Sequence, residues 1–213
     1  MSGPKLWHSQ NMNTPDDAPP VLDLQGWEKL RGSHAAYMSG TSQAYDEVLA
    51  EVASRVRATL SIGKTDIGAL LFWKRLRADT PWVRELMVKP EEEVREITKK
   101  AVSAVNDVSL PVPQAASAGR AALSPLPGFK TGDALASALL LAAAPERMAI
   151  YDERAQTGLE ILGLSLSPSR GRYGRYMELV EELRLAAGRY GHTWSARDVD
   201  IALFWLGGPE SLS

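Results

Sequence analysis

Apolar residues recur at intervals of three and four along most of this chain, and this spacing is what most limits the folds open to it. From Ser42 to Leu60 the apolar residues are Tyr45, Val48, Leu49, Val52, Val56 and Leu60. This period places them on one side of a helix. No segment alternates apolar and polar residues between hairpin turns, as a strand would. The sequence therefore predicts an all-α fold.

Capping and breaking residues divide the rest of the chain into further helices. Thr65 is expected to cap a helix that runs through Trp73 and ends near the Asp79-Thr80-Pro81 turn. Pro90 is expected to open another, with three glutamates in its first turn and Lys99 and Lys100 near its end, as the helix dipole favours. The loose stretch 107–127 has room for one short helix over 115–123. The other expected helices span 82–88, 133–144, 152–163, 173–189 and 196–206.

The first 25 residues contain four prolines among polar side chains, which predicts a poorly ordered arm over 1–25. The chain of 213 residues suits one compact domain, here 26–213. Two segments echo each other at the same spacing: Asp66 to Trp73 and Asp198 to Trp205. Two capped helices with an apolar face produce such a match by chance, so a single pair does not indicate a repeat.

Composition excludes several kinds of site. The chain has no cysteine, which rules out disulfides, thiolate zinc sites and a cysteine nucleophile. The three histidines, His8, His34 and His192, are far apart, which argues against a histidine metal centre and against a hydrolase triad. We expect His34 and His192 at the surface. The net charge of −2 argues against a protein that coats nucleic acid indiscriminately, but leaves room for a local basic face.

No membrane or export signal is visible in the sequence. The most apolar run, from Ala134 to Ala144, is shorter than the roughly 20 residues that a spanning helix needs. The N-terminus lacks the positive charge followed by an apolar stretch that marks a secretory signal. We therefore expect no membrane association and a cytoplasmic location.

The most informative segment is a glycine-bracketed turn that opens directly into a helix of small residues. The turn contains Gly128, Phe129, Lys130, Thr131 and Gly132. Glycines let a backbone pass close to a ligand, and a helix N-terminus presents unpaired N–H groups with partial positive charge. A phosphate suits such a site, although many purely structural corners also carry two glycines.

Downstream, the small-residue helix ends at Ala144-Pro145, and an apolar stretch leads to Asp152 at the start of the next helix. Asp at that position is commonly just a helix cap. In order and spacing, however, the Leu-Pro-Gly turn, helix, proline, apolar stretch and aspartate resemble the helix-hairpin-helix DNA glycosylases. The resemblance is best over residues 126–159. The segments 172–189 and 193–205 look like the closing helices of bacterial proteins with an 8-oxoguanine-glycosylase-type fold.

The resemblance implies a helix-hairpin-helix region over 123–163 whose turn, 128–132, grips a phosphate of double-stranded DNA. It places Asp152 in the pocket that receives an everted base. There the carboxylate would stabilise positive charge on the sugar and would orient or deprotonate the attacking water. This reaction needs no metal and no cofactor.

Two departures from the family pattern matter. The family turn reads Gly-apolar-Gly, whereas Lys130 and Thr131 precede Gly132 here. Members that also cut the strand carry a lysine two residues after the second glycine, and that position is Gly132 or Ala134 in this chain. Neither forms a Schiff base, so the expected activity is base excision without strand cleavage.

Aromatic and basic residues are further candidates for contacts with DNA, and each group also has a purely structural interpretation. Trp73, Tyr151, Tyr173 and Tyr176 are candidates for the base pocket, although aromatic residues at helical spacing are more often core. Basic residues near Gly63 and Gly171 indicate DNA contacts at Lys74, Arg75, Arg172 and Arg175. They equally fit solvated helix ends, with Arg175 paired to Glu178 or Glu182.

Two other functions stay open. The same fold can grip DNA without catalysis, as a binding module. Alternatively, the chain is a helical interaction protein, for example a defence or regulatory partner, in which Gly128 and Asp152 are only turn and cap.

Overall fold

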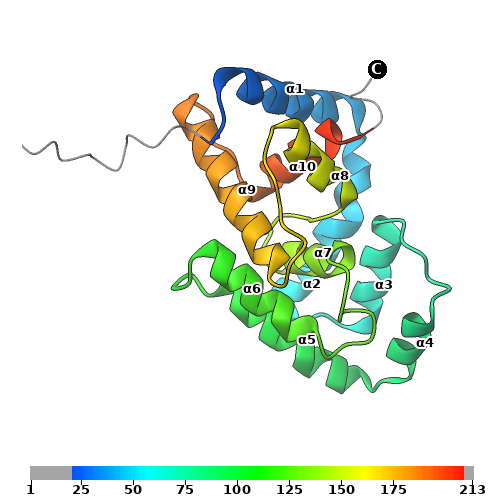
Figure 1. Ribbon diagram of the computed structural model, residues 1–213. Coiled ribbons are helices and arrows are strands. Elements are labelled where there is room, and N and C mark those ends of the chain that lie inside the picture. The colour runs from blue at the N-terminus through cyan, green and yellow to red at the C-terminus, as the bar shows by residue number, and fades with distance from the viewer. Residues whose placement is uncertain (1–20, 209–213) are drawn as a thin grey trace, which may run out of the picture.

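A computed structural model describes residues 21–208 (Figure 1). Over this range the chain forms ten α-helices and one 3₁₀ turn and contains no strand, so the all-α prediction is confirmed. The elements are α1 (Leu24–Gly40), η2 (Gln43–Asp46), α2 (Glu47–Thr59), α3 (Lys64–Trp73), α4 (Pro81–Val88), α5 (Glu91–Asn106), α6 (Val112–Leu123), α7 (Ala134–Ala143), α8 (Glu153–Ile161), α9 (Arg172–Arg189) and α10 (Ala196–Leu206).

The helix α1 was not predicted, because few of its residues are apolar. Only Trp27, Leu30, Ser33 and Tyr37 are buried along its length. Most of the predicted arm, residues 1–20, lies outside the described residues. Its last five residues are described, and they belong to the fold: Leu22 is buried and the Asp23 carboxylate accepts the Gly26 N–H to cap α1.

Several helix ends differ from the predicted ones. Gly63, not Thr65, is the N-cap of α3, and the Asp66 carboxylate accepts the Gly63 N–H. The helix ends at Trp73, well before the predicted turn at 79–81, because Arg75 has a left-handed φ of +54°. The helix α5 continues to Asn106, so Lys99 and Lys100 lie in its middle. The helix α6 begins at Val112, since Pro111 occupies its N-cap and removes no internal hydrogen bond.

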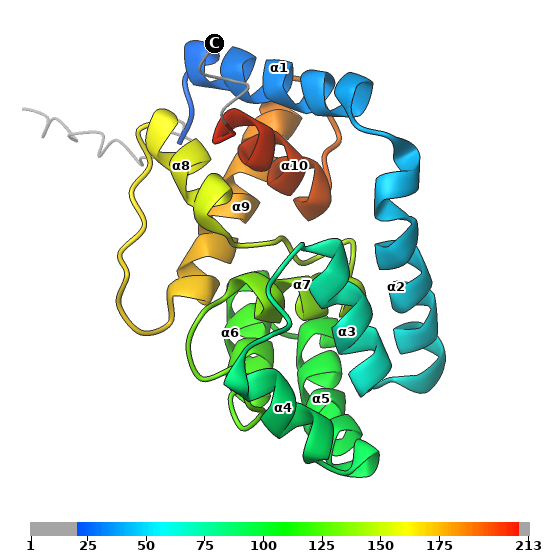
Figure 2. The same cartoon turned by 90° about the vertical axis from the view of Figure 1, so that its right-hand side faces the viewer.

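The helices form two groups stacked along the long axis of the molecule (Figure 2). At one end α1 and α8 pack on α10, and at the other end α5, α6 and α7 pack together with α2 and α3. The helix α9 runs between the groups and packs on both α10 and α6. The segment from Pro145 to Asp152 crosses the level where the two groups meet.

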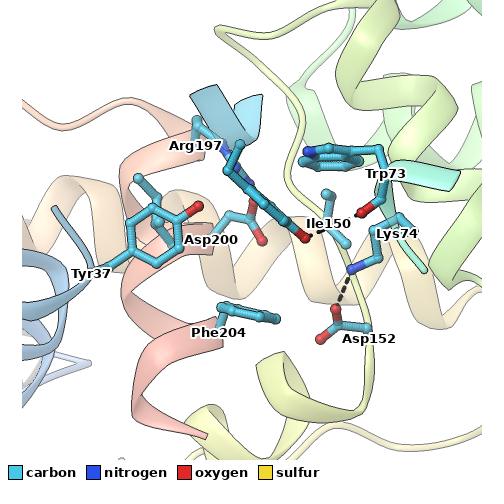
Figure 3. A pocket seen from close by; sticks show the side chains of 10 residues that line it. Tyr37, Trp73, Lys74, Ile150, Asp152, Arg197, Asp200 and Phe204 are labelled. Atoms are coloured by element: carbon cyan, nitrogen blue, oxygen red, sulfur yellow. Dashed lines mark hydrogen bonds and ion pairs between the residues drawn. The ribbon is translucent and has the colours of Figure 1, made fainter. Parts of the chain in front are cut away.

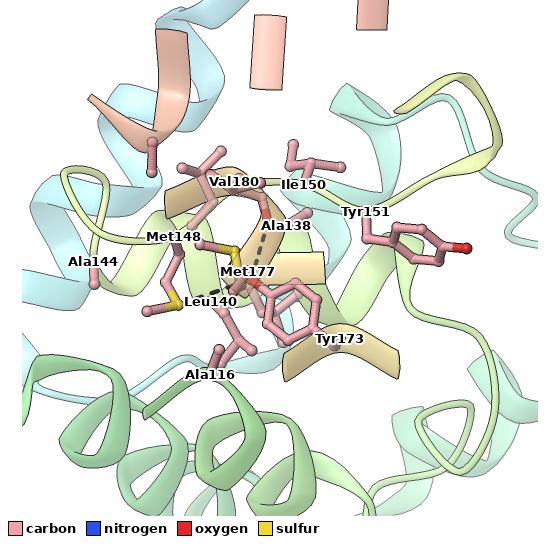
Figure 4. Packing of buried hydrophobic residues seen from close by; sticks show 14 of the residues in the cluster. Ala116, Ala138, Leu140, Ala144, Met148, Ile150, Tyr151, Tyr173, Met177 and Val180 are labelled. Carbon is pink, nitrogen blue, oxygen red and sulfur yellow. Dashed lines mark hydrogen bonds between the residues drawn. The ribbon is translucent and has the colours of Figure 1, made fainter. Parts of the chain in front are cut away.

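The helix α7 forms the centre of the second group. Every residue from Ala136 to Ala142 is buried, as expected for a helix that is apolar on all sides. Met148, Tyr173, Met177 and Val180 pack beside it (Figure 4). None of the helices in residues 21–208 is long and apolar enough to cross a membrane.

Candidate functional site

Asp152 follows an extended segment, Ala149 to Tyr151, that three side chains hold in place. The Tyr173 hydroxyl donates to the Ala149 carbonyl at 2.9 Å, and the Tyr176 hydroxyl donates to the Ile150 carbonyl at 2.8 Å. The Tyr151 N–H donates to the Ser137 hydroxyl at 3.0 Å. Burial raises the pKa of both Tyr173 and Tyr176, so both stay neutral donors.

Tyr173 and Tyr176, predicted as candidates for the base pocket, have a structural role in this conformation. Both rings are fully buried and both hydroxyls are used by the backbone. Their role in this structure is to fix the segment that carries Asp152.

The Asp152 carboxylate has two partners. One oxygen accepts the Ala155 N–H at 3.0 Å, which makes Asp152 the N-cap of α8. The other accepts from the Lys74 ammonium at 2.5 Å. The side chain of Asp152 is 16% exposed and that of Lys74 is 11% exposed. Lys74, predicted as a DNA contact, is therefore engaged in an ion pair with Asp152 in this structure.

Asp152 lies at the edge of a cavity between the two groups of helices, here called the Asp152 cavity (Figure 3). It is lined by Tyr37, Tyr45, Trp73, Lys74, Ile150, Asp152, Arg197, Asp200, Ile201 and Phe204. Of the predicted pocket aromatics, only Trp73 is in this lining. The space open to the centre of a water molecule is about 20 Å³, enough for a water or two but not for a base.

A buried ionic network forms the wall opposite Asp152. The Arg197 guanidinium donates to Asp200 and, at 2.9 Å, to Asp46 of η2. Burial raises the pKa of Asp200 from 3.8 to about 6, against the opposing charges of Arg197 and Lys74. Within the described residues, Asp46 Oδ1 and Trp73 Nε1 are buried and have no hydrogen-bond partner.

Tyr151 connects Asp152 to a second hollow. Its ring is buried, its hydroxyl donates to Gln156, and the Arg172 guanidinium lies 4.8 Å from the ring centroid. Arg172 also bonds the Asp133 carboxylate at 2.9 Å. Tyr151 is thus covered by Arg172 in this structure, so it does not form an open pocket wall.

The second hollow, here called the cationic groove, runs between α6, the turn before α7 and the start of α9. Its basic side chains are Arg120, Lys130, Arg170 and Arg172, and its acidic one is Asp133. Arg120 donates to Asp133 at 2.7 Å and to the Phe129 and Gly132 carbonyls, so the turn folds around it. The N-termini of α7 and α9 both reach this groove, which favours an anion.

The predicted phosphate turn divides into two parts. Gly128 has φ +84° and a Cβ there would overlap the Trp82 ring, while Phe129 is buried against that ring. Phe129, predicted as part of the DNA-binding turn, has its side chain in the core and leaves only its backbone for a contact. Lys130, Thr131 and Gly132 are exposed and line the cationic groove.

The two remaining predicted DNA contacts differ from each other. Arg175 donates to the Ser167, Ser169 and Arg170 carbonyls, so it holds the loop before α9 instead of pairing with Glu178 or Glu182. Arg75 is exposed, with the left-handed φ of +54° that ends α3. Of these two, only Arg75 presents its charge to solvent.

The histidines behave differently from each other. His34, expected at the surface, is partly buried and bonds Asp198 at 3.0 Å, which joins α1 to α10. His192 is exposed. In the part of the chain that the structure describes, no three His, Asp or Glu side chains are grouped as a metal site would need.

The sequence analysis missed Tyr37, Arg197, Asp200 and Phe204 because they come from α1 and α10, far along the chain from Asp152. One signal was present. Asp200 lies on the apolar side of α10, among Val199, Ile201 and Leu203, where a carboxylate needs a partner.

Searches of protein families, curated proteins and solved structures found no match to this chain.

Proposed function

We propose that this protein is a DNA glycosylase-like enzyme that releases a damaged or modified base from double-stranded DNA. The supporting observation is the position of Asp152, a carboxylate on a rigid segment at the edge of an aromatic-lined cavity. The contact between Tyr151 and Arg172 joins that edge to the cationic groove. That the region 123–163 forms a helix-hairpin-helix element, and that the protein works in the cytoplasm, are parts of the same proposal.

The reaction is hydrolysis of the N-glycosidic bond. Asp152 orients a water and takes its proton, the water oxygen bonds to the sugar C1′, and the bond from C1′ to the base breaks. The base leaves and takes up a proton. Because positive charge develops on the sugar as the bond breaks, a nearby carboxylate stabilises the transition state.

The phosphates are proposed to lie in the cationic groove. Lys130 and Arg170 are exposed there, Thr131 offers a hydroxyl, and the N-termini of α7 and α9 offer backbone N–H groups. Arg75, exposed just after the end of α3, is proposed as a further contact.

An excision assay tests the proposal. Duplexes that each carry one lesion or modified base are incubated with the wild type, with Asp152→Asn and with Asp107→Asn, and abasic sites are revealed by alkali. Asp107 is a matched control because it is an exposed carboxylate on a loop. Product with the wild type and with Asp107→Asn, but not with Asp152→Asn, supports the proposal. Product that survives Asp152→Asn would overturn the assigned role.

The same assay without alkali tests whether the enzyme only excises. The expectation of no strand cleavage rests on the absence of a lysine from the start of α7. The structure brings Lys74 to Asp152 from a different element, the end of α3. Strand breaks without alkali that disappear in Lys74→Arg would identify Lys74 as a Schiff-base amine and would replace the expectation of simple hydrolysis.

A second candidate is a DNA-binding module without catalysis. The small volume of the Asp152 cavity and the occupation of Asp152 by Lys74 favour it. This function predicts no product on any duplex, with binding that Lys130→Glu weakens and the control Lys99→Glu, on exposed α5 surface, does not. Neither product nor binding would favour the helical interaction protein.

A further inference from the structure

The cationic groove carries more positive charge than its own acidic side chain balances. Arg120, Lys130, Arg170 and Arg172 line it, and Asp133 is the acidic side chain among the described residues of the lining. The Asp133 carboxylate accepts from Arg120 at 2.7 Å and from Arg172 at 2.9 Å, so two guanidinium groups share one carboxylate. Four basic side chains against one acidic side chain leave the groove with a surplus of three positive charges.

Two of these cations are free to bind an anion. Lys130 and Arg170 are exposed, and neither side chain forms an ion pair or hydrogen bond with the residues that the structure describes. Ser124 and Thr131 add exposed hydroxyl groups to the same lining. The groove has a volume of about 570 Å³, which is in the range of sites that hold a small molecule.

The basic side chains reach the groove from three separate segments. Arg120 belongs to α6, Lys130 to the turn before α7, and Arg170 and Arg172 to the start of α9. The helix α6 packs directly on α9 (Figure 1), which brings these segments to one hollow. Charges that converge on one hollow favour a single group of high charge over a row of singly charged groups.

The two kinds of phosphate found in nucleotides and nucleic acids differ in charge. A phosphate monoester carries a charge of about −1.5 to −2 at neutral pH and has three free acceptor oxygens. An internal phosphodiester carries a single negative charge and has two such oxygens. Guanidinium groups bind phosphate oxygens in pairs, so the groove gains more from the monoester on both counts.

We infer that the cationic groove binds a phosphate monoester as a dianion, in preference to an internal phosphodiester. In DNA this group is the phosphate at the end of a strand, as at a nick or a gap. The step to DNA rests on the proposed function, whereas binding of the monoester itself does not.

Titration calorimetry with two nucleotides tests this inference without DNA. The probes are thymidine 5′-monophosphate and the same nucleotide with its phosphate methylated to a diester. The wild type is expected to bind the monoester about tenfold more tightly at neutral pH. Lys130→Met and Arg170→Met should each weaken binding of the monoester severalfold more than that of the diester, because each removed charge faces two negative charges instead of one. The control Lys99→Met, on exposed α5 surface, should match the wild type.

The pH dependence of the preference supplies a second readout. The second ionisation of a phosphate monoester has a pKa of about 6, so the ligand loses its second negative charge as pH falls from about 7.5 to about 5. No histidine lines the groove in the described part of the chain. The preference for the monoester should therefore fall from about tenfold to about twofold or less. Thermal melts establish that each variant is folded over this range.

Nicked duplexes distinguish the sources of the monoester. Three duplexes carry the same nick with a 5′-phosphate, with a 3′-phosphate or with hydroxyl groups alone, and binding is measured by fluorescence anisotropy. Binding about tenfold tighter at one of the phosphorylated nicks identifies the strand end that the groove takes. A monoester preference with the nucleotides, but equal affinity for the three nicks, identifies a free nucleotide as the ligand.

Equal affinity of the wild type for the two thymidine nucleotides, or no binding of either, would overturn the inference. So would a preference that Lys130→Met and Arg170→Met both leave intact. Preference for the monoester without excision from any duplex would leave the inference standing and remove the proposed function. Excision by an enzyme that binds the two nucleotides alike would do the reverse.

Discussion

The Tyr173 and Tyr176 hydroxyl groups hold the segment that leads to Asp152. The free energy of unfolding measures how much each hydroxyl contributes. Tyr176→Phe removes the donor to the Ile150 carbonyl and leaves that carbonyl buried without its partner. The expected cost is about 1–3 kcal/mol in urea unfolding. Tyr190→Phe is the control, because its hydroxyl donates to Leu22 at a longer 3.4 Å in a partly exposed place. Equal costs for the two variants would contradict a special role for Tyr176.

The buried Asp200 carboxyl gives the fold a specific pH dependence. Burial raises its pKa from 3.8 to about 6, so between these values the folded chain keeps a proton that the unfolded chain has released. The contribution of Asp200 to the free energy of unfolding therefore falls as pH rises from about 4 to about 6 and is level above that. The full decline is up to about 3 kcal/mol.

Urea unfolding of the wild type and Asp200→Asn at several pH values measures this contribution. The variant has no carboxyl to titrate at this position. The difference in free energy of unfolding between the variant and the wild type should therefore shift in favour of the variant as pH rises from about 4 to about 6. Curves that stay parallel from pH 4 to pH 7 would show that Asp200 is ionised throughout.

Among the elements, the turn before α7 has two glycines that differ in their surroundings. Both Gly128 and Gly132 have a left-handed φ, which costs about 1–2 kcal/mol for other residues. A Cβ on Gly128 would also overlap Trp82, whereas no described atom lies within 4 Å of one on Gly132. Gly128→Ala should therefore lower the melting temperature clearly more than Gly132→Ala. The reverse order would mean that this turn has another conformation in solution.

The matching sequence pattern of Asp66–Trp73 and Asp198–Trp205 has a local cause in how the two helices begin. Asp66 and Asp198 each lie three residues after a helix N-cap and accept that cap's N–H, from Gly63 and Ser195. The shared spacing is thus the spacing of a capped helix followed by its apolar face. It places Trp73 in the Asp152 cavity but gives no evidence of a repeat.

For the molecule as a whole, the sequence predicted the features that depend on residues close together in the chain. Apolar periodicity and capping residues predicted nine helices correctly, because those signals act within one or two turns. The helix α1, which was not predicted, buries few apolar residues. It is held by partners that are distant in the sequence, such as Asp198, which forms a hydrogen bond with His34. Of the residues that line the Asp152 cavity, Asp152, Trp73 and Lys74 were among the predicted site residues. Arg197, Asp200 and Phe204 were not, because they reach the cavity through packing of α10.

The net charge of the whole molecule is negative, whereas the cationic groove is locally positive. The salt dependence of DNA binding shows whether the groove is where DNA binds. The chain carries −2 overall, yet the cationic groove holds four basic side chains around one acid. If this groove holds phosphates, the logarithm of the DNA association constant falls linearly with the logarithm of salt concentration, by about 0.9 for each phosphate neutralised. Lys130→Glu and Arg170→Glu should each reduce that slope by about 1, because each removes one such contact. Lys99→Glu changes the net charge equally and should leave the slope unchanged. Equal slopes for all three variants would place the DNA elsewhere on the surface.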